Sequence, residues 1–153
     1  MRTTGLLAVL LLFSGCAVPI NIEGGDSKDS QPYAKPFDEV WRAVTATLEK
    51  KGFRLHVQDK ASGRIVTEWT VRLYPAWREG RRERLEIEIL PVPSRPEPRH
   101  KLRVRSTREV NDNEKSPMSE KDASWAYAGG NDEARDHILY LVQLRLKGAG
   151  FDD

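Results

Sequence analysis

The sequence has no long apolar run. Its longest hydrophobic stretch extends only from Gly5 to Phe13, whereas a helix that spans the hydrocarbon layer of a membrane needs about twenty apolar residues. A stretch of this kind behind a single basic residue, Arg2, is typical of the core of a signal peptide. The sequence therefore predicts that the chain is exported.

Residues that commonly carry catalysis or bind metals are sparse. The histidines His56, His100 and His137 are scattered, and no pair has the spacing of metal ligands. No serine lies in a Gly-x-Ser-x-Gly turn, and Gly129-Gly130 lacks the rest of a phosphate-binding loop. We therefore expect no catalytic residue, no metal site and no cofactor, and we interpret the histidines as surface or structural side chains.

An excess of charge of one sign is also absent. The chain has 25 lysines and arginines against 23 aspartates and glutamates. Proteins that bind nucleic acid usually gather positive charge on one face, so this balance argues against a nucleic-acid partner. With 31% charged and 39% hydrophobic residues in 153, the composition predicts one well-solvated domain with a modest core.

The only cysteine, Cys16, follows directly after the apolar stretch. The run from Leu12 to Cys16, Leu-Phe-Ser-Gly-Cys, resembles the lipobox of bacterial lipoprotein precursors, with Phe13 where Leu is usual. The resemblance implies that a diacylglycerol is attached to Cys16 and that a peptidase cuts just before it, with Ser14 and Gly15 as the small flanking residues. An ordinary secretory signal with an incidental cysteine is the alternative.

A lipidated cysteine has consequences for location. Two or more acyl chains, such as palmitate, make a stable anchor at about 0.8 kcal/mol per buried methylene. Acylation of Cys16 leaves no thiol for a disulfide or a thiolate metal site. The resemblance also implies the sorting rule of Gram-negative lipoproteins, in which Asp directly after the lipidated cysteine retains a protein in the inner membrane. This chain has Ala17 at that position and therefore lacks the retention signal. We expect the periplasmic face of the outer membrane, if the source is Gram-negative.

The chain divides into four predicted segments. Residues 1–15 are the signal peptide, and residues 16–35 are a polar, turn-rich tether with a root-mean-square reach of about 25 Å. Residues 36–147 form a single α+β domain, and residues 148–153 are a tail.

The domain contains two predicted helices that flank a run of strands. Apolar residues at helical spacing predict the first helix over residues 36–51, and Asn131 or Asp132 caps the second. Between them, alternation with a period of two predicts about four to five strands of an antiparallel meander with one wet face. Trp41 and Trp69 lie in the apolar stripes and are predicted core residues.

The predicted wet face carries interleaved charges. Glu86 and Glu88 lie on one strand, and the strands that flank it in sequence carry arginines, namely Arg64, Arg72, Arg103 and Arg105. We expect ion pairs across the strands, each worth a few tenths of a kcal/mol, rather than a catalytic carboxylate pair. The basic cluster around Arg81-Arg82 is interpreted as a solvated turn, with contact to an anionic headgroup as the alternative.

Residues 109–130 show no period and are predicted to form a long loop. Near its end, Trp125 and Tyr127 are the candidate partner-binding residues, because aromatic side chains often anchor the centres of interfaces. The alternative is that they close the open end of the core.

The first part of the domain resembles the BamC-like group of small bacterial envelope lipoproteins. The resemblance covers about residues 36–73, and the residues that carry it are Phe37, Val40-Trp41, Gly52-Phe53, Asp59, Gly63-Arg64-Ile65 and Trp69. It implies a helix-grip-like layer, in which a curved antiparallel sheet holds a long helix. It also implies a non-catalytic role, for example as an accessory of membrane-protein assembly.

These observations favour a non-enzymatic, lipid-anchored envelope protein that acts by protein–protein interaction. The main alternative is a carrier for a small apolar ligand, which would need a pocket between sheet and helix lined by Trp41 and Trp69. A hydrolase with an unfamiliar site is a third hypothesis, and it would need a cleft that gathers Glu or Asp with His.

The anchor prediction is tested by replacing Cys16 with Ala. The Cys16→Ala variant should leave the membrane fraction and appear in the soluble fraction, because it has no thiol to acylate, while its circular dichroism spectrum stays unchanged. A Cys16→Ala protein that still sediments with membranes contradicts the lipid anchor.

Overall fold

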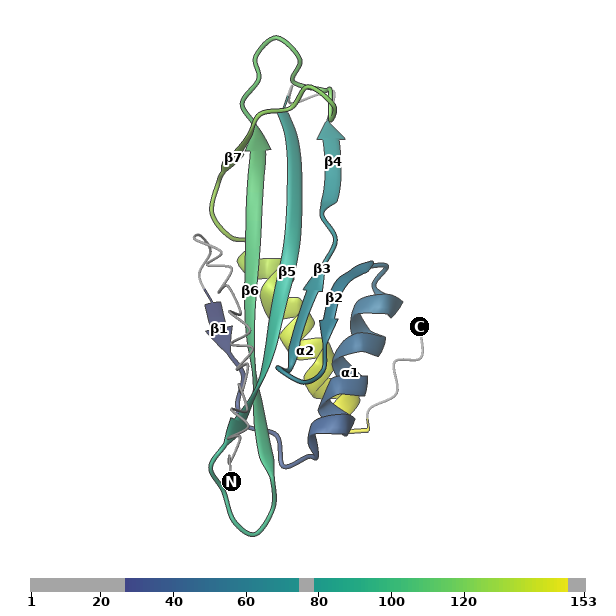
Figure 1. The fold of residues 1–153 in the computed structure, drawn as a ribbon, viewed down its shortest axis with the longest axis vertical. Helices are drawn as coiled ribbons and strands as arrows, with labels where there is room; N and C mark the ends of the chain where they lie inside the picture. Colours follow the sequence, from purple (N-terminus) through teal and green to yellow (C-terminus); the bar gives the residue numbers. More distant parts are fainter. Residues whose placement is uncertain (1–26, 75–78, 149–153) are drawn as a thin grey trace, which may run out of the picture.

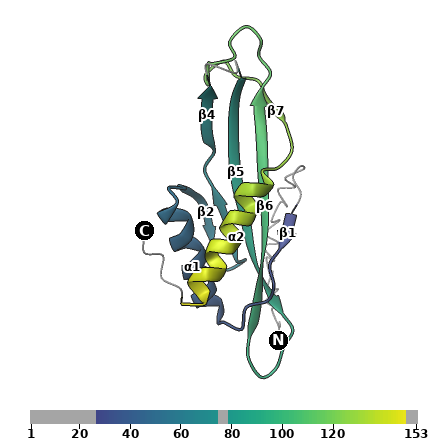
Figure 2. The ribbon, with the colours of Figure 1, turned by 180° about the vertical axis from the view of Figure 1, so that it is seen from behind.

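The computed structural model describes residues 27–74 and 79–148, which form an antiparallel β-sheet with two helices on one face (Figure 1, Figure 2). The α+β class, the antiparallel sheet and the two helices predicted from the sequence are confirmed. The predicted signal peptide with Ser14 and Gly15, and the predicted lipidation site Cys16, lie outside the described residues.

Two long strands, β5 (Glu79–Val92) and β6 (Arg99–Asn111), form the centre of the sheet and pair over twelve consecutive residues of β5. The shorter strands are β1 (Ser27–Asp29), β2 (Leu55–Asp59), β3 (Arg64–Thr67), β4 (Thr70–Tyr74) and β7 (Trp125–Tyr127). β3 and β4 both pair with β5, β1 and β7 pair with β6, and β2 pairs with β3. Within residues 27–74 and 79–148 the sheet thus has seven strands, whereas the sequence predicts about four to five.

α1 (Phe37–Lys50) and α2 (Asp132–Leu146) pack against each other on the sheet (Figure 2). α1 starts directly after Pro36 and is followed by Gly52, whose φ of 80° is the left-handed conformation that ends many helices. The side chain of Asn131 caps α2 by accepting a hydrogen bond from the N–H of Ala134 at 3.1 Å. Both helices therefore lie where the sequence predicts them.

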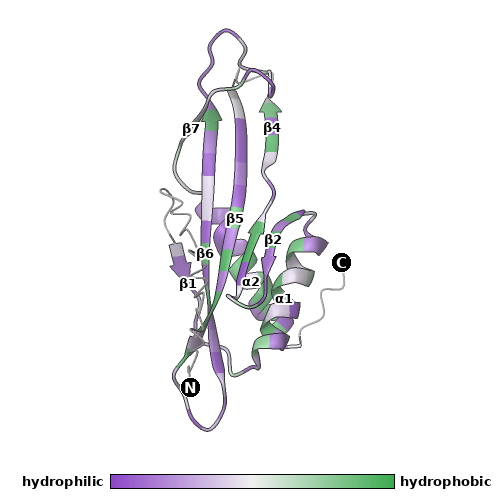
Figure 3. Ribbon diagram, viewed as in Figure 1, coloured by the Kyte–Doolittle hydropathy of each residue, from purple (hydrophilic) through white to green (hydrophobic). Residues whose placement is uncertain are grey.

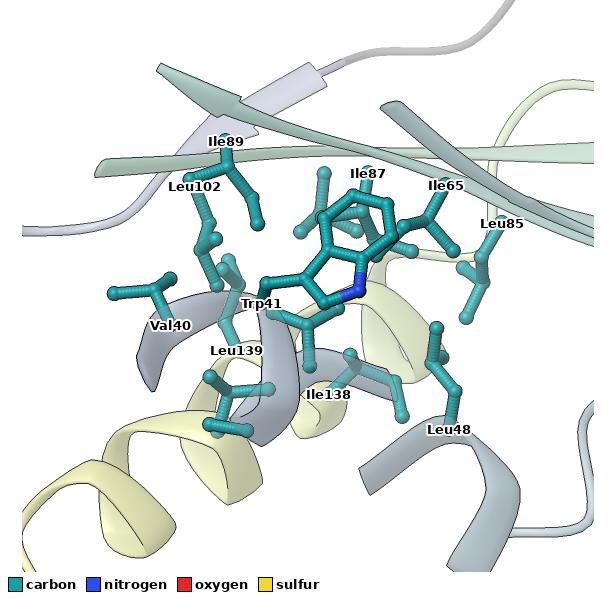
Figure 4. Packing of buried hydrophobic residues seen from close by; sticks show 14 of the residues in the cluster. Val40, Trp41, Leu48, Ile65, Leu85, Ile87, Ile89, Leu102, Ile138 and Leu139 are labelled. Carbon is teal, nitrogen blue, oxygen red and sulfur yellow. The ribbon is translucent and has the colours of Figure 1, made fainter. Parts of the chain in front are cut away.

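A hydrophobic core fills the space between the helices and the half of the sheet that they cover (Figure 4). Trp41 is 9% exposed and belongs to this core, as predicted. The other buried members are Val40, Ala43, Val44, Leu48, Ile65, Leu85, Ile87, Ile89, Leu102, Val104, Ile138, Leu139, Val142 and Leu146. Trp69 is not among them, so its assignment to the core is wrong.

The position of Trp69 follows from a break in the strand that the sequence predicts over residues 64–73. Val66 of β3 lies opposite Glu86, whereas Thr70 of β4 lies opposite Glu83, so the chain gains one residue relative to β5 between the two strands. One extra residue reverses which side chains face the helices. Trp69 therefore lies on the outer face of the sheet, which the helices do not cover.

β1 is the second departure from the prediction, because its residues were assigned to the flexible tether. The sheet begins at Ser27, nine residues before the predicted domain start at residue 36. The carboxylate of Asp29 binds Lys101 and Arg103 of β6, and Lys28 binds Asp136 of α2 at 2.7 Å. The charged residues of β1 make this segment look like a linker in the sequence. In the structure they form ion pairs with opposite charges on β6 and α2, which are distant in sequence.

The helices cover only part of the sheet. Beyond them extend β4, β7 and the ends of β5 and β6 that pair with these strands (Figure 1, Figure 2). We call β4, β7, residues 79–84 of β5 and residues 107–111 of β6 the distal sheet. Hydrophilic residues dominate the distal part of β5 and the loop that follows β6 (Figure 3). This part of the sheet is therefore held together by means other than burial under a helix.

The Asp29 contacts predict an acid-dependent part of the stability. Arg103 and Lys101 lower the pKa of Asp29 to about 2 from its ordinary value of 3.8. A lowered pKa in the folded state contributes stability above pH 3.8 that is lost as the pH falls towards 2. The free energy of unfolding, measured with urea at several pH values, should fall less steeply over this range in Asp29→Asn than in the wild type. Equal slopes contradict the docking of β1 by these ion pairs.

Candidate interaction surface

The outer face of the distal sheet carries stacked arginine and tryptophan side chains. The guanidinium carbon of Arg82 lies 4.4 Å from the ring centroid of Trp69 and 4.7 Å from that of Trp125. Arg84 lies over Trp69 at 4.5 Å. We call these four residues, Trp69, Arg82, Arg84 and Trp125, the arginine–tryptophan cluster.

Strand register explains why these side chains meet. Leu85, Ile87 and Ile89 of β5 point to the helices, so the even-numbered residues of β5 point to the outer face. One row across this face joins all four distal strands, and its members are Val71, Arg82, Glu109 and Tyr127. The interpretation of Arg81-Arg82 as a solvated turn is therefore wrong, because both residues belong to a central strand.

The two arginines of the cluster differ in how their charge is balanced. Arg82 forms an ion pair with Glu109 at 2.6 Å, and both side chains are about three-quarters buried. Among the described residues Arg84 forms no ion pair, and its buried Nε has no hydrogen-bond partner. Its guanidinium group instead makes a cation–π contact with the ring of Trp69.

The predicted pair Trp125 and Tyr127 lies on this same face. Trp125 is half-buried against Arg82 and does not belong to the hydrophobic core, so the alternative that it closes the core is wrong. Tyr127 is 52% exposed, and among the described residues the only other large hydrophobic side chain as exposed as this is Tyr140 of α2, at 56%. The structure thus brings the two predicted residues to a surface with Trp69, Arg82 and Glu109.

The loop of residues 112–124 lies beside the cluster, and Asn111 organises it. Its side-chain Nδ2 donates to the carbonyls of Ser116 and Pro117, and its Oδ1 accepts from the N–H groups of Asn113 and Ser124. The carbonyl of Pro117 approaches Gly80 so closely that a Cβ there would lie 3.2 Å from it. The sequence predicts only a loop here. Hydrogen bonds to a single asparagine side chain leave no repeating pattern of residue types from which the structure of the loop could be predicted.

The predicted ion pairs of Glu86 and Glu88 with Arg64, Arg103 and Arg105 are confirmed. The predicted place of Arg72 on the same face is wrong, because the register of β4 puts it on the helix-covered side, opposite Arg81. Oε1 of Glu86 binds Nε of Arg64 at 2.7 Å, and guanidinium nitrogens of Arg105 and Arg103 lie 4.0 Å from Glu86 and Glu88 respectively. The hollow between these residues has a volume of about 10 Å³, roughly the space of one water. The two carboxylates are therefore balanced by arginines, as on an ordinary solvated face.

The predicted histidines are placed apart. His100 is half-buried and its Nδ1 lies 2.9 Å from the carbonyl oxygen of Lys35, while its ring meets Phe37 edge-on. His56 on β2 and His137 on α2 are exposed. In residues 27–74 and 79–148, no three His, Cys, Asp or Glu side chains are grouped so that they could hold a metal ion.

A cavity of about 120 Å³ lies on the helix-covered side, where the distal sheet meets the start of α2. Its walls include Phe53, Thr70 and Arg72 on one side and Asn131 and Ala134 on the other. It borders the core at Leu85 and Phe53, but neither Trp41 nor Trp69 lines it. Trp41 and Trp69 lie on opposite faces of the sheet. The described residues therefore do not form the pocket between Trp41 and Trp69 that the carrier hypothesis requires.

Comparison with known proteins gives no further assignment, since the chain matches no model of a protein family and no curated protein. In the part of the chain that the structure describes, no helix is both long and apolar enough to cross a membrane.

The stacked side chains predict a measurable cost for losing Arg82. Arg82→Ala removes two cation–π contacts and the ion pair with Glu109, so the free energy of unfolding in urea should fall by about 1–2 kcal/mol. Arg54→Ala, at an exposed arginine of the connection before β2, should change it by less than about 0.5 kcal/mol. Equal effects of the two substitutions contradict a stabilising role for the stack.

Proposed function

We propose that this protein is a non-enzymatic, lipid-anchored protein of the bacterial envelope that acts by protein–protein interaction. Its place is the periplasmic face of the outer membrane, and its role is that of an accessory in outer-membrane protein assembly or envelope maintenance. We also propose a helix-grip-like arrangement, in which the half of the sheet that the helices cover holds α1. It excludes catalysis, cofactors and nucleic acid.

The observation that carries the proposal is the outer face of the distal sheet. Tryptophan, tyrosine and arginine are the residues most enriched at the energetic centres of protein interfaces. Here Trp69, Trp125, Tyr127, Arg82 and Arg84 share one face that the helices leave uncovered. The rings and the guanidinium groups already hold each other in place, so a partner would immobilise few side chains on binding.

The proposed anchor keeps this face close to the membrane. Cys16 precedes the first residue of β1, Ser27, by eleven positions, and a chain of that length spans at most about 40 Å. Membrane proteins and proteins held at the same bilayer therefore lie within reach. This supports an accessory role at the membrane.

A carrier for a small apolar ligand is the weaker proposal. It would need space between sheet and helices, where Val40, Val44, Leu48, Ile65 and Ile87 pack with exposures of 0%. A substitution that enlarges this space would lower stability.

The two exposed tyrosines provide a matched test of the interaction face. Cells that make the full chain are treated with a mild cross-linker, and the protein is purified from solubilised membranes. Tyr127→Ala should reduce the recovery of a cross-linked envelope partner at least about threefold, because Tyr127 lies on the proposed face. Tyr140→Ala removes an equally exposed ring from α2 and should leave recovery unchanged.

Two outcomes contradict the proposal. One is that no envelope protein is cross-linked to the wild type. The other is that Tyr140→Ala lowers recovery as much as Tyr127→Ala, which would place the partner elsewhere on the domain.

A further inference from the structure

Charges on the outer face of the sheet are matched across β5 and β6, with one exception. Three outer residues of β5 lie directly opposite a side chain of the other sign on β6, namely Arg82 opposite Glu109, Glu86 opposite Arg105 and Glu88 opposite Arg103. Arg84 lies within this series, but the residue directly opposite it is Thr107, which carries no charge. Opposite charges that face each other across strands stabilise a sheet, so Arg84 lacks the contact that its neighbours on β5 have.

The carboxylates nearest to Arg84 on this face are engaged by other arginines. Glu86 binds Arg64 at 2.7 Å, and Glu109 binds Arg82 at 2.6 Å. In the part of the chain that the structure describes, the side chain of Arg84 forms no ion pair and no hydrogen bond. Its Nε is buried, whereas its two terminal nitrogens are not among the buried atoms that lack a partner. The end of the guanidinium group is therefore open to a group from outside.

Trp69 holds this guanidinium group in position. The guanidinium carbon of Arg84 lies 4.5 Å from the centroid of the Trp69 ring, and Arg82 contacts the same ring at 4.4 Å. A guanidinium group that stacks on a ring uses its flat face, so the N–H groups at its edge stay free to bind both oxygens of a carboxylate. Because the group is already oriented, it loses little conformational freedom when a carboxylate binds.

The charge balance around Arg84 favours a single carboxylate over a polyanion. Anionic lipid surfaces and nucleic acids are recognised by clusters of several lysines and arginines. Here Arg82, the neighbouring arginine of the cluster, is already neutralised by Glu109. Within the described residues of the outer series on β5, one unmatched positive charge is left. One acidic side chain would balance it, and the pair of Arg82 with Glu109 shows that a carboxylate fits beside the same stack.

We propose that Arg84 binds the carboxylate of one Asp or Glu side chain of the partner protein. The terminal nitrogens of Arg84 donate hydrogen bonds to the two carboxylate oxygens, and Trp69 keeps the guanidinium group oriented. The incoming carboxylate thereby completes the series of matched charges along β5. This inference rests on the proposed function, since it names the group of the partner that the arginine–tryptophan cluster recognises.

Removal and reversal of the charge test the proposal in cells that make the full chain, with the mild cross-linker used for Tyr127. Arg84→Gln should lower recovery of the envelope partner at least about threefold and Arg84→Glu at least about tenfold, because the partner's carboxylate first loses its ion pair and then meets a like charge. Arg42→Glu on the exposed side of α1 is the matched control and should leave recovery unchanged. Equal recovery from the wild type and Arg84→Glu overturns the proposal.

A cross-link without a spacer tests direct contact with a carboxylate. Arg84→Lys keeps a positive charge that can lie over Trp69 and places a reactive amine at position 84. A water-soluble carbodiimide, applied to membranes that contain this variant, joins an amine to a carboxylate where the two are in contact. An amide bond forms, and the carbodiimide takes up the water that is lost and becomes a urea. Mass spectrometry should show position 84 joined to an Asp or Glu of another protein.

The same reagent gives three results that overturn the proposal. An amide between position 84 and a carboxylate of this chain, such as Glu86, shows that the site is filled from within. Adducts of the partner at other lysines of the chain, with none at position 84, place its carboxylates elsewhere. Arg42→Lys is the matched control, and adducts at position 42 as abundant as those at position 84 show only general reactivity of exposed amines.

Vesicles test whether a lipid headgroup takes the place of the carboxylate. The full chain with Cys16→Ala, which has no thiol to acylate, is mixed with vesicles of phosphatidylglycerol and separated by flotation. It should stay in solution, because one unmatched arginine attracts an anionic surface only weakly. Binding that Arg84→Glu abolishes identifies a lipid phosphate as the ligand and overturns the proposal.

The recovery of the partner separates this inference from its basis. If Tyr127→Ala lowers recovery of an envelope partner and Arg84→Glu does not, the proposed function stands and this inference is removed. If no envelope protein is cross-linked to the wild type, the proposed function and this inference are both removed.

Discussion

The continuous pairing of β5 with β6 is the constraint on which the rest of the structure depends. The two strands keep one register over twelve residues of β5. The register that turns one set of side chains towards the helices at one end of the ladder therefore also decides which side chains face outward at the other end. Leu85 and Ile87 lie under the helices for the same reason that Arg82 and Arg84 lie on the outer face. A single ladder thus positions both the core and the candidate interaction surface.

The two halves of this ladder are stabilised by different physics. Beside the helices, burial of aliphatic side chains dominates, and Ile87 and Val104 are fully buried. In the distal sheet, stacking of Arg82 between two tryptophans and its ion pair with Glu109 replace burial under a helix. Contacts of this kind are weaker than a core, but they leave polar and aromatic groups at the surface, where a partner can use them.

A structural feature of this protein can be predicted from the sequence where its residues repeat at a regular spacing. The stripe of α1 and the acid–base alternation at Glu86 appear in the sequence because they repeat. Trp69 was misplaced because alternation continues through a one-residue shift, and only the pairing with β5 reveals the shift. β1 and β7 have three residues each, too few for a period, and their partners lie far away in sequence. The contact of both Trp69 and Trp125 with Arg82 could not be predicted for the same reason.

The place of β1 also sets how the domain would respond to mechanical force. If the chain is held at Cys16, a pull on the domain reaches β1 before any other strand of the described residues. β1 is attached through three paired residues and surface ion pairs, whereas the core strands behind it are buried. Under load, β1 would therefore separate first and lengthen the tether, while the sheet and helices stay folded. With the chain held in that way, the strand would act as an extensible link between Cys16 and the rest of the domain.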